Sequence, residues 1–253
     1  MSAAPGRPQA SSHRSPQGEG ILMTQTLVLL PGLNNTHAVF DGVVRALPGG
    51  IAALALDNPA LETVEAIAQA HLAQLPERFW LAGFSFGGYV ALAMLEAAPQ
   101  RVQGIAMICT GPTADSPAAR DKRLAALKAV AQGRYFELIE QQAANAFHPD
   151  SLKNVALMQA RSAMVRAYGV TSYAAHVRAT MARPDRCALL DGSRPTLVVT
   201  ASHDTVIPPQ TVAQYAAAIP GAQQHVVEGA GHLLPMEQPA ELAALLADWM
   251  VVT

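Results

Sequence analysis

The chain has 253 residues, of which 51% are hydrophobic and only 14% charged, and this composition excludes disorder of the whole chain. Its 17 basic and 19 acidic residues give a net charge of −2, so there is no basic surplus for binding nucleic acid. The longest apolar runs, such as residues 51–56 and 89–95, are far shorter than the ~18 residues that a membrane-spanning helix needs. The only cysteines, Cys109 and Cys187, form no C-x-x-C pair, which argues against a disulfide framework and favours a cytoplasmic protein.

The beginning of the chain differs in composition from the rest. Its first twenty residues are rich in Pro, Gly, Ser and Gln and contain no apolar run. Such a segment cannot bury enough surface to offset the entropy of ordering. We therefore predict a disordered tail over residues 1–22.

From residue 24 onward, short apolar runs alternate with helical patterns, which is typical of βαβ units and a parallel sheet. The runs predict six buried strands, at residues 25–30, 51–56, 79–84, 102–109, 196–201 and 224–227. The segments between them predict helices at residues 38–47, 61–75, 88–97, 211–219 and 240–251. Between the fourth and fifth strands only helical patterns occur, at residues 118–131, 135–146 and 152–167. The sequence thus predicts a core of residues 23–112 and 192–253, with a helical cap at residues 113–191.

The first chemical motif, GFSFGG, lies between a predicted strand and a predicted helix and centres on Ser85. A sharp turn at this point strains the backbone of the serine and exposes its hydroxyl above the sheet. Small residues at Gly83 and Gly87 relieve the crowding of such a turn. The alternative interpretation is a glycine-rich turn that only joins a strand to a helix.

A serine nucleophile needs a base, and the base needs an acid that holds it in one tautomer. Asp204 follows the fifth predicted strand, and His232 lies in a glycine-flanked loop after the sixth. The carboxyl ends of parallel strands are where ligand crevices form in such sheets. Ser85, Asp204 and His232 are therefore the candidate catalytic residues, in the chain order Ser, Asp, His. Asp115, one strand earlier, is the rival candidate for the acid.

The stretches LVLLPG, LAGFSFGGYVAL, TLVVTASHDTVIPP and EGAGHLLPMEQPAEL resemble the α/β-hydrolase superfamily. Within it the chain is most similar to bacterial enol-lactonases and pimeloyl-carrier methyl ester carboxylesterases. The resemblance implies an α/β-hydrolase fold with helices on both faces of the sheet, but without the N-terminal hairpin, because LVLLPG comes too early in the chain. It also implies an oxyanion hole made by the backbone N–H groups of Leu33 and Phe86.

The motifs and the resemblance predict a serine hydrolase that cleaves a carboxylic ester or lactone through an acyl-enzyme, with no metal or cofactor. A carbon–carbon bond hydrolase or a perhydrolase would use the same triad, and a ligand receptor could keep the fold without turnover. Residues 113–190 carry eleven basic and six acidic side chains. Such a basic cap could attract an anionic small-molecule substrate, although solvated helix faces would have the same composition.

Overall fold

The computed structural model describes Met1 and residues 24–251, so the predicted disordered tail lies outside the described residues apart from Met1. Six strands form one sheet in the order β2-β1-β3-β4-β5-β6, and every neighbouring pair is parallel. The strands are β1 (Gln25–Leu30), β2 (Ile51–Ala55), β3 (Phe79–Phe84), β4 (Val102–Ile108), β5 (Thr196–Ala201) and β6 (Gln223–Val227). This is the α/β-hydrolase fold that the sequence predicts.

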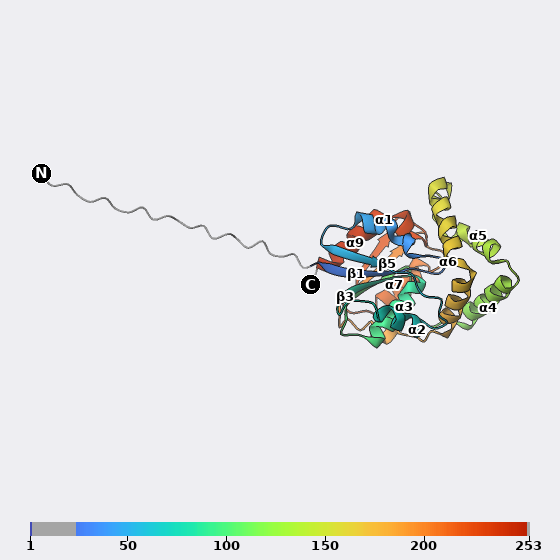
Figure 1. Cartoon of the computed structure of the whole chain (residues 1–253), viewed down its shortest axis with the longest axis horizontal. Coiled ribbons are helices and arrows are strands. Elements are labelled where there is room, and N and C mark those ends of the chain that lie inside the picture. The colour runs from blue at the N-terminus through green and yellow to red at the C-terminus, as the bar shows by residue number, and fades with distance from the viewer. Residues whose placement is uncertain (2–23, 252–253) are drawn as a thin grey trace.

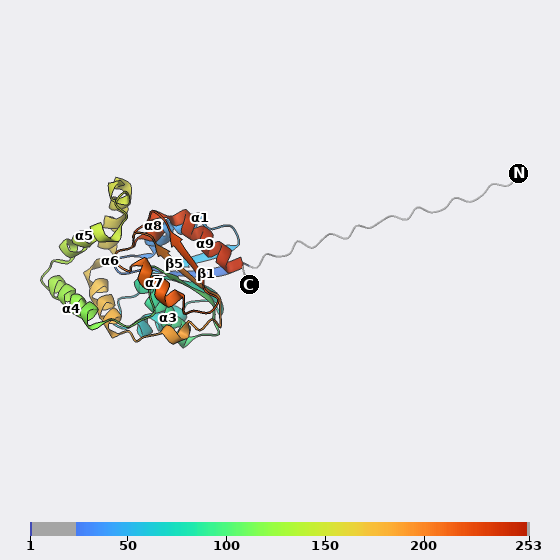
Figure 2. The same ribbon diagram turned by 180° about the vertical axis from the view of Figure 1, so that it is seen from behind.

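Helices cover both faces of the sheet because alternate strand residues point to opposite faces. In β1, Leu27 and Leu29 pack in one apolar cluster with α1 and α9, whereas Val28 and Leu30 pack in another with α2, α3 and α7. Figures 1 and 2 show these two helix layers on opposite sides of the sheet. The core helices are η1 (His37–Phe40), α1 (Asp41–Ala46), α2 (Val64–Leu72), α3 (Phe86–Ala97), α7 (Pro209–Ala216), α8 (Leu234–Glu237) and α9 (Pro239–Val251).

The outer strands differ from the prediction that all six strands are buried on both faces. Exposed and partly buried residues alternate along β2, and three consecutive residues of β6 are exposed, including Val226. Both strands lie at an edge of the sheet, where a strand has a neighbour on one side only. Their apolar composition therefore indicated strands correctly but overstated their burial.

The connection between β4 and β5 contains the helices of the predicted cap. They lie together at one end of the molecule, opposite the start of β1 and the end of α9 (Figure 1). Gly169, with φ of 76°, interrupts the longest of them, which continues well beyond the predicted end at residue 167. The elements are α4 (Pro117–Ala131), α5 (Tyr135–Ala146), η2 (Ser151–Lys153), α6 (Val155–Ala182) and η3 (Cys187–Leu189). The division between core and cap at residues 113 and 191 stays a prediction.

A helix that crosses a bilayer must be about 20 residues long and predominantly apolar. Among residues 24–251, no helix is both long enough and apolar enough to cross a membrane. α6 is the longest, at 28 residues, but it carries arginines along its length.

Candidate active site

Ser85, Asp204 and His232 meet at the carboxyl edge of the sheet. Ser85 follows β3, Asp204 follows β5 and His232 follows β6. All the strands run parallel, so the loops that leave their carboxyl ends lie side by side. The structure therefore brings together three side chains that are up to 147 residues apart in the sequence.

The backbone at Ser85 is strained, with φ of 50° and ψ of −116°, a conformation that residues with a side chain seldom adopt. It places Ser85 immediately before α3, which begins at Phe86. The turn requires glycine beside it, because a Cβ on Gly87 would lie 2.1 Å from the carbonyl oxygen of Leu30. Close packing against β1 thus explains the GFSFGG motif.

The three side chains form a continuous chain of hydrogen bonds. His232 Nδ1 lies 2.8 Å from Asp204 Oδ2, and His232 Nε2 lies 2.9 Å from Ser85 Oγ. A carboxylate only accepts hydrogen bonds, so Nδ1 carries the proton and Nε2 is left to accept the Ser85 hydroxyl. This arrangement can remove a proton from Ser85.

Further contacts hold Asp204 in this orientation. Its second oxygen, Oδ1, accepts the backbone N–H groups of Val206 and Ile207, both at 2.8 Å, and only 3% of the residue is exposed. The rival acid, Asp115, is engaged elsewhere. It accepts hydrogen bonds from Arg123 and Arg183 in the cap. The geometry therefore favours Asp204 as the partner of His232.

The loop after β1 lies directly against Ser85. A Cβ on Gly32 would come within 3.1 Å of the Cβ of Ser85. Asn35 N–H donates to the carbonyl of Gly32 at 3.3 Å, which makes residues 32–35 a β-turn. Within the described chain the backbone N–H groups of Leu33 and Phe86 have no hydrogen-bond acceptor. Both are free to donate to an oxyanion beside Ser85.

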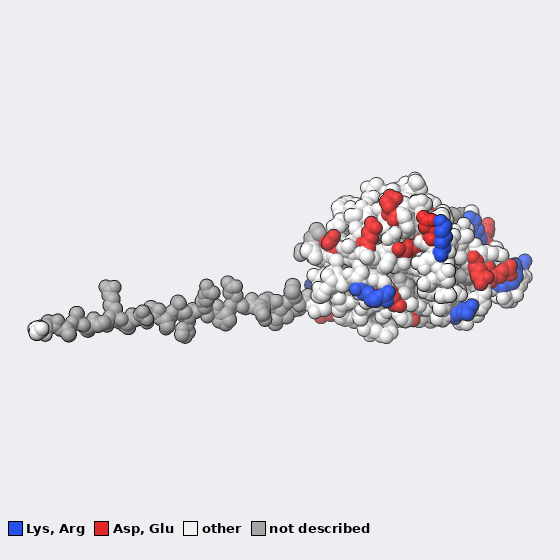
Figure 3. Space-filling model, turned by 90° about the horizontal axis from the view of Figure 1, so that it is seen from above, with Lys and Arg blue, Asp and Glu red and all other residues white. Residues whose placement is uncertain are grey.

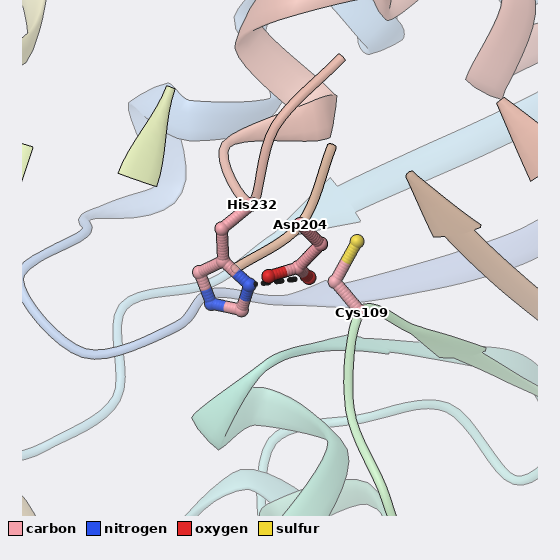
Figure 4. A group of neighbouring side chains, drawn as sticks. All are labelled: Cys109, Asp204 and His232. Carbon is pink, nitrogen blue, oxygen red and sulfur yellow. Dashed lines mark hydrogen bonds and ion pairs between the residues drawn. The ribbon is translucent and has the colours of Figure 1, made fainter. Parts of the chain in front are cut away.

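Cys109 is a neighbour of Asp204 and His232 that sequence reasoning missed. Figure 4 shows its thiol beside the Asp204 carboxylate, and the potential ligand atoms of Cys109, Asp204 and His232 all lie within 4.8 Å of one another. Burial, and then the negative charge of Asp204, raise the pKa of the Cys109 thiol well above its usual range. The thiol therefore stays protonated at neutral pH, which is not the form that binds metals. No sequence signal marked it, because its contacts come from loops far away in the chain.

A cavity of about 830 Å³ opens onto Ser85 and His232. The loop after β1 and the cap helices α4, α5 and α6 form its walls, and its basic residues are Lys122, Arg123 and Arg161. No Asp or Glu is among its lining residues in the described chain. The cavity thus has a positive lining, which suits an anionic ligand.

Arg161 is not paired with a carboxylate of the described chain, unlike Arg123 and Arg183. Arg123 and Arg183 are paired with Asp115, whereas Arg161 has no carboxylate within 4 Å among the described residues. Its Nη1 donates to the backbone carbonyl of Asn34 at 2.5 Å. Burial lowers the pKa of Arg161 to about 10, with Tyr135 and Tyr168 opposing the shift, so its guanidinium is charged at neutral pH.

Two histidines lie in surroundings that the sequence did not indicate. His176, a cap residue, is fully buried and stacks on Phe86 with ring centroids 4.9 Å apart. His37, the first residue of η1, is exposed, and its Nδ1 lies 3.0 Å from Asp57 Oδ2. The orientation of a helix relative to the sheet decides such placements, and a single sequence does not contain it.

Comparison with known proteins places the chain in a family. A profile of the alpha/beta hydrolase family matches residues 27–245. The protein is a member of the alpha/beta hydrolase family. The matched residues include the sheet, apart from the start of β1. They also include the cap and the loops that carry Asp204 and His232.

Several known hydrolases are similar to this family member. The pimeloyl-[acyl-carrier protein] methyl ester esterase of Nitrosomonas europaea is 31% identical over 111 residues, which is 41% of this chain and 42% of that protein. The chain spans less than half of the length of the curated relatives it matches. A thermophilic esterase of Thermogutta terrifontis superposes with a TM-score of 0.82, at 25% identity, covering 90% of this chain and 89% of that one.

The fold is also that of the enol-lactonase of Burkholderia xenovorans. That structure superposes with a TM-score of 0.79, at 22% identity, covering 90% of this chain and 92% of the other. Similarity to enol-lactonases and to pimeloyl-carrier methyl ester esterases is what the sequence motifs suggested. The chain is therefore a hydrolase-family protein with esterase-like and lactonase-like relatives.

Proposed function

We propose that the protein is a serine hydrolase that cleaves a carboxylic ester or lactone through an acyl-enzyme. The observation that carries this proposal is the hydrogen-bonded chain from Asp204 through His232 to Ser85, beside two free backbone N–H groups. A base, an oriented nucleophile and oxyanion donors are the parts that acyl transfer needs.

In the first half of the reaction, Ser85 Oγ attacks the carbonyl carbon while His232 Nε2 takes the hydroxyl proton. The carbonyl electrons move onto oxygen, and the N–H groups of Leu33 and Phe86 stabilise that charge. His232 then gives its proton to the leaving oxygen as the ester C–O bond breaks. Asp204 stabilises the imidazolium formed in between.

In the second half, water attacks the acyl carbon and gives a proton to His232. The tetrahedral intermediate collapses by breaking its bond to Ser85 Oγ, which recovers the proton from His232. The carboxylic acid leaves. No cofactor or metal enters this proposed reaction, since water and the triad supply every atom that is exchanged.

We further propose that the substrate carries a negative charge. The cavity is lined by Lys122, Arg123 and Arg161 and by no acidic residue of the described chain. Arg123 already contacts the carboxylate of Asp115, so Lys122 and Arg161 are the lining cations of the described chain that have no carboxylate partner. A carboxylate suits the fork-shaped donor set of a guanidinium.

Three other functions could use the same residues. A carbon–carbon bond hydrolase or a perhydrolase would keep the triad, and one solved structure of this fold, at 16% identity, is described as a bromoperoxidase from Bacillus anthracis. A ligand receptor would keep the cavity and lack turnover. The 2.9 Å contact between His232 and Ser85 Oγ, ready for proton transfer, favours an enzyme over a receptor. The similarity to esterases favours an ester or lactone over the other two reactions.

The test is hydrolysis of a panel of p-nitrophenyl esters and lactones, with and without a free carboxylate, by wild type and by Ser85→Ala. The proposal expects turnover of at least one neutral or anionic member and its loss in Ser85→Ala. Binding without turnover would favour the receptor. Turnover that survives in Ser85→Ala would refute the assignment of Ser85 as the nucleophile.

A further inference from the structure

The turn that carries the Leu33 N–H has a defined internal geometry. Asn35 N–H donates to the Gly32 carbonyl, and the Asn35 side-chain amide donates to the Leu33 carbonyl at 2.6 Å. The carbonyl of Gly32 and the N–H of Leu33 belong to one peptide plane and point in opposite directions. Fixing that carbonyl therefore aims the N–H of Leu33.

Asn34 occupies the strained position of this turn. Its φ is 59°, in the left-handed region, and it is 5% exposed. Asparagine tolerates this conformation better than most residues, but the conformation still needs support from its surroundings. The direction of the Leu33 N–H thus depends on what holds Asn34.

Two cap side chains hold Asn34. The Tyr135 hydroxyl donates to Asn34 Oδ1 at 3.0 Å, the shorter of its two contacts, since the carbonyl of Val165 is an alternative acceptor at 3.3 Å. Arg161 Nη1 donates to the Asn34 backbone carbonyl at 2.5 Å. Tyr135 begins α5 and Arg161 lies in the first half of α6, so both cap helices reach the turn. Burial raises the pKa of Tyr135 far above neutral, so its hydroxyl remains a donor in any ordinary assay.

We propose that Tyr135 is a positioning residue of the cap that, through Asn34, holds the oxyanion-hole turn in its donating orientation. The proposal rests on the proposed function, because it assigns the Leu33 N–H to the oxyanion. It makes the cap part of the catalytic apparatus as well as a wall of the cavity.

This role has a kinetic signature, because oxyanion donors act mainly in the transition state. Removing one such donor lowers kcat by roughly 10² to 10³. Loosening its support should cost less, about tenfold, and should leave KM nearly unchanged. Tyr135 is also buried in the cap against Tyr173, with ring centroids 5.3 Å apart, so a purely structural role is the alternative.

The experiment compares Tyr135→Phe with Thr180→Val. Thr180 is a fully buried cap residue whose hydroxyl donates to the His176 carbonyl, so this control also deletes one buried cap hydroxyl, away from Asn34. Two quantities are measured: kcat and KM on a neutral p-nitrophenyl ester, and the affinity for an arylboronic acid. The boronic acid adds to Ser85 Oγ and places a tetrahedral oxygen at the oxyanion site whether or not turnover occurs.

A third variant tests whether Tyr135 acts through the turn. Asn34→Gly keeps the left-handed conformation and removes the Oδ1 acceptor. We expect Tyr135→Phe and Asn34→Gly each to lower kcat and boronic acid affinity about tenfold, with KM within about twofold. The double variant should be no worse than either single variant, because residues that act as one unit are not additive.

Three results would overturn the inference: Tyr135→Phe matching Thr180→Val, a change in KM in place of kcat, or additive losses in the double variant. Asn34→Gly keeps the test decisive if Tyr135→Phe does not fold by circular dichroism. A wild type that neither hydrolyses esters nor binds the boronic acid would instead refute the proposed function, and with it this inference.

Discussion

In the proposed mechanism Ser85 needs His232 as a base, because a serine hydroxyl is a weak nucleophile at neutral pH. We expect Ser85→Ala and His232→Ala each to lower kcat by roughly 10⁴ or more, since triad residues act as a unit. Steady-state kinetics on a p-nitrophenyl ester measures the loss, with circular dichroism as the control for folding. Wild-type activity in either variant would show that the substituted residue does not take part in catalysis.

The acid can be tested by paired substitutions at Asp204 and Asp115. Asp204 contacts His232 at 2.8 Å, whereas Asp115 is bound to arginines of the cap. Asp204→Asn should lower kcat by roughly 10³ to 10⁴, because the amide favours the wrong imidazole tautomer. Asp115→Asn should cost less than tenfold in kcat. The opposite ranking would assign the acid to the earlier strand.

The site residues that can be identified from the sequence are those whose neighbours in the chain form a recognisable motif. Ser85 sits in a glycine motif, and Asp204 and His232 follow recognisable strands, so their meeting follows from the parallel sheet. Cys109 and Asn34 carry no such signal. Their importance comes from contacts with segments about 95 to 125 residues away, which only the folded chain brings together.

At the scale of elements, Asp115 ties three segments together. It lies between β4 and α4 and accepts hydrogen bonds from Arg123 of α4 and from Arg183, which directly follows α6. Asp115 and Arg183 are almost fully buried, with side chains 4% and 7% exposed. Asp115→Asn leaves a buried cation unpaired, so we expect it to lower the free energy of unfolding by about 2–3 kcal/mol at pH 7.

This loss should depend on pH in a defined direction. Burial raises the pKa of Asp115, but the hydrogen bonds and charges of Arg123 and Arg183 outweigh burial and lower the pKa below 3.8. Because the pKa of Asp115 is lower in the folded chain than in the unfolded chain, its ionised form stabilises the fold at any pH above the unfolded-state pKa. That stabilisation is lost as the pH falls through the folded-state pKa. Thermal melts of wild type and Asp115→Asn should therefore differ at pH 7 and begin to converge only as the pH falls below about 4. A constant difference would contradict the ion-pair account.

The elements themselves were largely predictable, because buried parallel strands read as short apolar runs. β1, β3, β5 and α5 have the predicted bounds. The departures have local causes. α6 continues past Gly169, whose φ of 76° marks a kink and not an end, and a glycine in a helical pattern does not distinguish the two.

At the scale of the whole molecule, the basic surplus of the cap is partly neutralised. Arg186 contacts Glu65 and Glu96 of the core, and Arg178 contacts Glu62. On the face in Figure 3, acidic and basic side chains are mixed at the end formed by the cap helices. The field that a substrate meets is therefore set by the cations of the cavity, and the cap composition alone overstates it.

We expect an ester with a free carboxylate to have a higher kcat/KM than its neutral isostere. Added salt should reduce the advantage, since exposed charges are screened over ~10 Å at 0.1 M. Arg161→Met should lower the ratio of kcat/KM for the carboxylate ester to kcat/KM for the neutral ester. Arg161 also contacts Asn34, but a loss caused by the turn affects both esters equally and cancels in the ratio. Equal or salt-independent values for the two esters in wild type would make the basic cap a solubility feature.

The proposed mechanism requires that Ser85 becomes acylated during turnover. The most direct measurement is mass spectrometry of peptides from wild type that has been mixed with a p-nitrophenyl ester and quenched with acid within milliseconds. We expect the mass of the acyl group on the peptide that contains Ser85, with one p-nitrophenol released per acylated site, and no adduct in His232→Ala. Turnover without any acyl group on Ser85 would contradict the proposed mechanism.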